Sequence, residues 1–117
     1  EGVTFALRDN LEALRATGAR LDRFLAIGGG SQSRFWVETI AATLNLPIDL
    51  PASGEFGAAF GAARLALIGD TGSDPASVMT PPEISQTIDP DRALTASYED
   101  AYQNYRALYP ALKGTET

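Results

Sequence analysis

The chain has 117 residues, 44% of them hydrophobic, and a formal net charge of −6 at pH 7. This length suffices for one hydrophobic core, so a single compact unit is expected. The acidic balance disfavours contact with phosphodiester backbones, and we expect no nucleic-acid partner. Cysteine and histidine are absent, which excludes disulfides, cysteine nucleophiles and histidine bases.

The first residues, Glu1 to Phe5, do not have the pattern of a secretory leader, in which a basic segment precedes an apolar one. No apolar stretch reaches the length of a membrane span. We therefore expect a cytoplasmic protein without a membrane partner. Because the chain starts without methionine, inside a segment with helical periodicity, we also expect it to be cut from a longer polypeptide.

The N-terminal third predicts a helix followed by a buried strand. Apolar residues recur at three- and four-residue spacing: Val3, Leu7, Leu11 and Leu14. This spacing predicts a helix over residues 3–17 that ends at Gly18. The unbroken apolar run from Phe24 to Ile27 predicts a strand over 21–27, covered on both faces as in parallel sheets.

A βαβ unit is predicted next. Gly28, Gly29 and Gly30 end the strand, and either Ser31 or Ser33 can cap a following helix. That helix stops before Pro47, and a short strand over 48–50 follows. The two strands are expected to be parallel.

The C-terminal half predicts two helices separated by a long surface segment. A helix is expected over 54–68, where Gly57 and Gly61 indicate the close approach of another backbone or of a ligand, and tight helix packing is the simpler of the two explanations. Residues 69–94 are rich in proline and polar residues and predict a surface excursion without chemistry. The last helix, 95–109, is expected to end at Pro110. Its tyrosines form one packing stripe: Tyr98, Tyr102, Tyr105 and Tyr109.

The three glycines are the strongest local signal for a binding site. A helix N-terminus offers unpaired N–H groups and a partial positive charge, and glycine lets an anion reach the main chain. The alternative is that the glycines only make a tight turn, which from the local pattern alone is the commoner explanation. The pattern matches neither the dinucleotide fingerprint nor the P-loop.

Three carboxylates lie nearest the predicted turns: Glu38, Asp49 and Glu55. Each is able in principle to orient a sugar hydroxyl or a metal, although most such acids are simply solvated. Glu55 is kept as a weak candidate, since a carboxylate at a helix start is explained by the helix dipole alone. No catalytic residue and no metal site are predicted in this chain.

Several segments, in the correct order, resemble the FGGY family of carbohydrate kinases and its xylulokinase branch in particular. Residues 1–9 resemble the family's opening helix, Ile27 to Gly30 with Ser33 and Trp36 resemble its adenosine motif, and residues 57–66 resemble its small-residue helix. The tyrosine-bearing end is similar to the closing helix, so the resemblance covers nearly the whole chain.

The resemblance implies an α/β fold, part of the C-terminal actin-like, ribonuclease-H-like ATPase domain of a sugar kinase. Residues 1–117 would form the C-terminal portion of the second, nucleotide-binding lobe, with the N-terminal lobe absent. It also implies that Gly28, Gly29 and Gly30 contact the phosphates and ribose of ATP, and that Ser33 lies near the adenine ring.

The implied reaction is the Mg²⁺- and ATP-dependent phosphorylation of a ketopentose such as D-xylulose. The catalytic aspartate and the sugar-binding lobe would lie upstream, so this chain is expected to be inactive alone. The alternatives are a kinase for another pentose or polyol, a non-catalytic nucleotide-binding or regulatory module of the same fold, and a scaffold whose glycines are only a turn. An exposed sheet edge would favour homo-oligomers.

Overall fold

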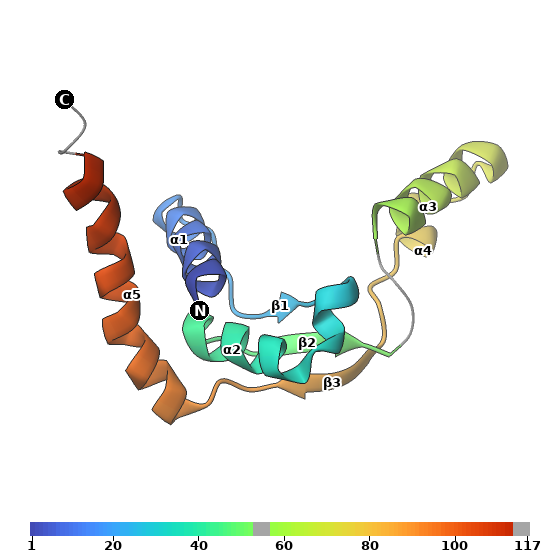
Figure 1. Cartoon of the computed structure of the whole chain (residues 1–117). Coiled ribbons are helices and arrows are strands. Elements are labelled where there is room, and N and C mark those ends of the chain that lie inside the picture. The colour runs from blue at the N-terminus through green and yellow to red at the C-terminus, as the bar shows by residue number, and fades with distance from the viewer. Residues whose placement is uncertain (53–56, 114–117) are drawn as a thin grey trace.

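The structure is a computed structural model that describes residues 1–52 and 57–113. Five α-helices, three strands and one 3₁₀ turn are found in these ranges (Figure 1). In chain order they are α1 (Gly2–Ala16), β1 (Phe24–Leu25), the 3₁₀ turn η1 (Gly29–Gln32), α2 (Arg34–Leu44), β2 (Ile48–Pro51), α3 (Ala58–Thr71), α4 (Pro75–Val78), β3 (Ile84–Ile88) and α5 (Arg92–Lys113).

The strands form one sheet in the order β1-β2-β3. β1 pairs with β2 in parallel, with Phe24 opposite Ile48, which confirms the predicted parallel βαβ unit. β1 is shorter than the predicted strand over 21–27, and Leu25 is 39% exposed, so the expected cover on both faces is not found in the described residues.

Residues 69–94 lie at the surface as predicted, with Ile88 the one buried residue of this range, but they also contain regular structure that the sequence did not indicate. This range contains the short helix α4 and the strand β3, which pairs with β2 in the antiparallel direction. Four of the five β3 residues are exposed and only Ile88 is buried. An edge strand of this kind lacks the alternation of apolar and polar residues from which strands are read.

The core lies where α2 packs against the sheet and against α1. Val37 and Ala41 of α2 have no exposed surface, and Leu11 and Ile48 are 2% exposed. Ser33 caps α2 by accepting a hydrogen bond from the N–H of Trp36 at 3.4 Å. Asn45 ends α2 in the left-handed conformation, so the predicted helix between the glycines and Pro47 is confirmed.

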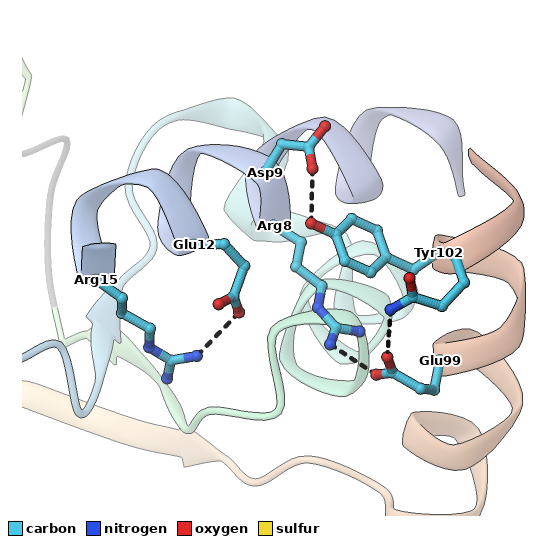
Figure 2. A network of polar contacts seen from close by, with 7 residues as sticks. Arg8, Asp9, Glu12, Arg15, Glu99 and Tyr102 are labelled. Carbon is cyan, nitrogen blue, oxygen red and sulfur yellow. Dashed lines mark hydrogen bonds and ion pairs between the residues drawn. The ribbon is translucent and has the colours of Figure 1, made fainter. Parts of the chain in front are cut away.

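Helices α1 and α5 are joined by a network of polar contacts (Figure 2). The hydroxyl of Tyr102, a residue that is 2% exposed, donates a hydrogen bond of 2.6 Å to Asp9 Oδ1. Arg8 forms a 2.6 Å ion pair with Glu99, and its guanidinium carbon lies 4.2 Å from the centre of the Tyr102 ring. Burial and, second, the hydrogen bond to Asp9 raise the pKa of Tyr102 to about 12.

The predicted tyrosine stripe is a packing surface over most of its length. The rings of Tyr98, Tyr102 and Tyr105 all lie within 6.2 Å of the Phe5 ring, measured between centres. Tyr109, in contrast, is 70% exposed.

Helix α5 does not end at Pro110 as predicted but continues to Lys113. A proline lacks one backbone N–H, so a single hydrogen bond to the preceding turn is lost. The tyrosines of α5 already hold the helix against α1, and the missing hydrogen bond lies in the last turn, so the helix tolerates Pro110.

Helices α3 and α4 form an arm that extends away from the core (Figure 1). The radius of gyration is 18.0 Å, against about 13 Å for a compact domain of this length, so the expectation of one compact unit is wrong. None of the α3 residues is buried, and no described atom lies within 4 Å of a Cβ built on Gly61. The predicted tight packing on the glycine face is therefore not found among the described residues.

Among the helices in the described ranges, none combines the length and the apolar character that crossing a membrane requires.

We expect Tyr102→Phe to change the alkaline stability of the fold. The raised pKa means that the folded state favours the protonated phenol, so its contribution is complete below about pH 10 and is lost between about pH 10 and the folded pKa of about 12. At pH 8 the free energy of unfolding of the variant should be about 1 kcal/mol lower than that of the unaltered chain, because the hydrogen bond to Asp9 is missing. Between about pH 10 and 12 it should fall less steeply than that of the unaltered chain. Urea midpoints measured against pH check this.

Tyr109→Phe is the matched control, because Tyr109 lies on the same helix and is exposed. Parallel curves for Tyr102→Phe and the unaltered chain above pH 10 would contradict the expectation.

Candidate functional site

The glycine turn connects the parallel strand β1 to helix α2. Gly28 has φ 81° and ψ −179°, a combination that is essentially restricted to glycine. The turn η1 is closed by hydrogen bonds from the N–H of Ser31 to Gly28 O at 3.1 Å and from the N–H of Ser33 to Gly30 O at 3.2 Å. No residue of η1 is buried, so its main chain is accessible.

The turn leaves backbone donors available. The N–H groups of Gly29 and Gly30 have no hydrogen-bond partner within the described residues, because they precede the first bond of η1. The same holds for the N–H groups of Arg34 and Phe35 in the first turn of α2. A Cβ built on Gly29 meets no described atom within 4 Å. The turn η1 and the first turn of α2 thus present unpaired donors, with open space beside Gly29, an arrangement that suits an anion such as phosphate.

The two serines have different roles. Ser33 caps α2, as one of the two sequence alternatives proposed, and its Oγ is the acceptor for Trp36. Ser31 instead donates its hydroxyl to Gly28 O at 2.7 Å and so stabilises the turn. A hydroxyl that accepts a backbone N–H still has its own hydrogen to donate, so capping leaves Ser33 able to contact a ligand.

An apolar groove of about 430 Å³ begins beside the turn and runs between α1, β1 and α2. Gly30, Ser31 and Trp36 line the end of the groove at the turn. Leucines of α1 and the exposed residues Leu25 and Ile27 line the remainder. The site therefore combines a donor-rich turn with an adjoining apolar surface.

The three candidate carboxylates are not brought together. Glu55 lies outside the described residues. Glu38 forms a 2.7 Å ion pair with Arg34 on the surface of α2. The described ranges contain no group of three Asp, Glu, His or Cys side chains that could hold a metal ion.

Asp49 is occupied in structural contacts. Its Oδ1 accepts hydrogen bonds of 2.6 Å from Arg23 and from Thr87. The hydrogen bond from the Arg23 guanidinium, followed by that from Thr87, holds the pKa of Asp49 below its ordinary value. The sequence reasoning missed Arg23, because no local pattern connects it to a carboxylate 26 residues later.

We expect Gly28→Ala to destabilise the chain and Gly30→Ala to leave it nearly unchanged. Alanine at position 28 is forced into a strained backbone conformation that costs about 1–3 kcal/mol. At position 30 the added Cβ would lie 3.6 Å from the Trp36 ring, an ordinary contact, without positive φ. Urea denaturation compares the two variants, and equal free energies of unfolding would contradict the assigned turn geometry.

Comparison with known proteins shows which family the chain resembles. Residues 1–69 match the FGGY family of carbohydrate kinases, C-terminal domain. The xylulose kinase of Escherichia coli K12 is 32% identical over 113 residues, which are 96% of this chain and 23% of that protein. The chain thus spans about a quarter of the length of this relative.

Two solved structures of relatives are also similar to this chain. The crystal structure of a xyloylose kinase from Brucella ovis is 54% identical with a TM-score of 0.87, over 97% of this chain and 24% of that one. The xylulose kinase from Rhodospirillum rubrum is 33% identical with a TM-score of 0.75, over 96% of this chain and 23% of that one. The chain therefore belongs to the FGGY family of carbohydrate kinases, and it forms part of their C-terminal domain, which has the actin-like ATPase fold.

Proposed function

We propose that the chain is part of an ATP-dependent xylulose kinase and supplies nucleotide contacts to it. The observation that carries the proposal is the pair of unpaired N–H groups at Gly29 and Gly30, beside open space at the start of α2. Membership of a carbohydrate kinase family supports a phosphate ligand at this position. Relatives named as xylulose kinases support xylulose as the sugar.

Residues 1–117 are proposed to be the C-terminal portion of the nucleotide-binding lobe. The N–H groups of Gly29 and Gly30 would bind phosphate oxygens, and Gly28 would lie against the ribose. Ser33 would reach the adenine ring with its remaining hydroxyl hydrogen, and the apolar groove offers a surface beside the base. Mg²⁺ would arrive with the phosphates, and we assign it no ligand among the described residues, which contain no cluster of three Asp, Glu, His or Cys side chains that could hold a metal ion.

The chain alone would not catalyse phosphoryl transfer, because it offers only some of the groups that the reaction requires. The reaction requires a positioned γ-phosphate, charge neutralisation and an oriented sugar hydroxyl. The described residues offer phosphate donors, but their carboxylates are dispersed or paired, as at Asp49 and Glu38. The catalytic aspartate and the sugar site are proposed to belong to the rest of the kinase, with Glu55 as a weak candidate for a sugar contact. We further propose a cytoplasmic location and self-association through the sheet edge.

We expect the chain to bind Mg·ATP weakly and Gly29→Ala to weaken binding about tenfold or more, or about 1.4 kcal/mol. The added methyl group would meet no described atom within 4 Å, so it should affect an approaching phosphate and not the fold. Isothermal titration calorimetry measures the affinity, and urea denaturation confirms that the variant is folded. Equal affinities for both chains, or no binding by the folded chain, would count against the site.

We expect no xylulose phosphorylation by the isolated chain at any ATP concentration. A coupled assay for ADP release, with and without D-xylulose, tests this. Sugar-dependent ADP release that survives further purification would show that the chain contains its own base and sugar site, contrary to the proposal.

A further inference from the structure

Asp49 lies in the middle strand of the sheet, β2, and is hydrogen-bonded to the chain on both sides of that strand. Its Oδ1 accepts bonds of 2.6 Å from Arg23, which immediately precedes β1, and from Thr87 of β3. Thr87 is its direct partner in the antiparallel pairing, so the two side chains lie on one face of the sheet. The main-chain carbonyl of Asp49 accepts a bond of 2.9 Å from the N–H of Ala26, which immediately follows β1. Asp49 therefore holds β1 at both of its ends.

Strand β1 is short and lies at the edge of the described sheet. It consists of Phe24 and Leu25 and pairs with β2 alone. A hydrogen bond of 3.1 Å joins the N–H of Phe24 to Pro47 O, and Leu25 is 39% exposed. A strand of two residues forms few ladder bonds of its own. Its position therefore depends strongly on the contacts of the residues that flank it.

A carboxylate is an unfavourable side chain for a buried position in a middle strand. Asp49 is 7% exposed, and a buried charge needs partners that replace its lost hydration. An apolar β-branched side chain suits such a position, and buried ion pairs are often no more stabilising than apolar residues of similar volume. The carboxylate differs from an apolar side chain in being directional: one oxygen fixes a donor before β1 and a donor on β3.

We infer that Asp49 is a positioning residue for β1, the strand that leads into the glycine turn. Its carboxylate is held from one side by Thr87 and binds Arg23 on the other, and so sets the place of β1 against β2. The role of this placement in nucleotide binding rests on the proposed function, in which the N–H groups of Gly29 and Gly30 bind phosphate. The placement of β1 itself is testable without any nucleotide.

The first test replaces Arg23, whose side chain is 60% exposed, so that the core stays intact. Arg23→Met should raise the amide exchange rates of Phe24 and Ala26, measured by NMR on the nucleotide-free chain, about fivefold, as expected for a partly exposed ion pair. The amides of α2 should change much less. Arg23→Lys should restore most of the protection, because its ammonium group can still donate to Asp49.

Arg20→Met is the matched control, because it makes the same change in net charge three residues earlier. The Arg20 side chain has no hydrogen bond or ion pair within the described residues, so the variant should change neither amide. Unchanged exchange at Phe24 and Ala26 in Arg23→Met overturns the inference. So does an equal increase in Arg20→Met.

The second test separates positioning from general stabilisation. A triple variant, Arg23→Met with Asp49→Leu and Thr87→Val, replaces the polar contact by apolar side chains. Its free energy of unfolding in urea should stay close to that of the unaltered chain, while exchange at Ala26 rises as in Arg23→Met. A triple variant that is less stable and exchanges faster throughout α2 as well would show a purely structural contact and overturn the inference.

The third test is Mg·ATP affinity by calorimetry on the single variants. Affinity that falls in Arg23→Met, recovers in Arg23→Lys and is unchanged in Arg20→Met supports both the positioning role and the nucleotide site. If the unaltered chain binds no ATP while Arg23→Met still loosens β1, the nucleotide proposal fails and the positioning of β1 stands. Unchanged ATP affinity in an Arg23→Met chain with a loosened β1 overturns the role of this placement in binding.

Discussion

The burial of one face of α2 is the constraint on which the other elements depend. Val37 and Ala41 have no exposed surface, and α2 contacts α1, α5, β2, β3 and the turn η1. Small alanine side chains allow the neighbouring elements to approach closely, and a larger side chain at Ala41 would overpack the core. Because α2 starts directly after the glycine turn, its fixed position also fixes the turn.

The glycine turn can bind an anion because its glycines carry no side chains that would cover the backbone N–H groups. Gly28 adopts a backbone conformation closed to other residues, and Gly29 carries no side chain into the space beside its N–H. The net charge of −6 offers an anionic ligand no general attraction, so a phosphate would depend on local donors and the partial charge of the helix start.

The arm formed by α3 and α4 has a different character from the core. α3 is apolar around most of its circumference, and Phe60, Leu65 and Leu67 are all at least 39% exposed. Helices that are hydrophobic on all sides are normally buried within a larger protein. The chain spans 23% of the length of the Escherichia coli relative, so the corresponding helix of that protein has much more chain around it.

The sequence by itself determined the features that depend on neighbours along the chain. The helix between the glycines and Pro47 and the glycine turn after the strand were both predicted, because caps, breakers and positive φ are set by a few adjacent residues. Only the tertiary structure decided the pairing of β3 with β2, the continuation of α5 past Pro110, and the contacts between Tyr102 and Asp9. These rest on groups up to 93 residues apart in sequence, whose energies no local pattern contains.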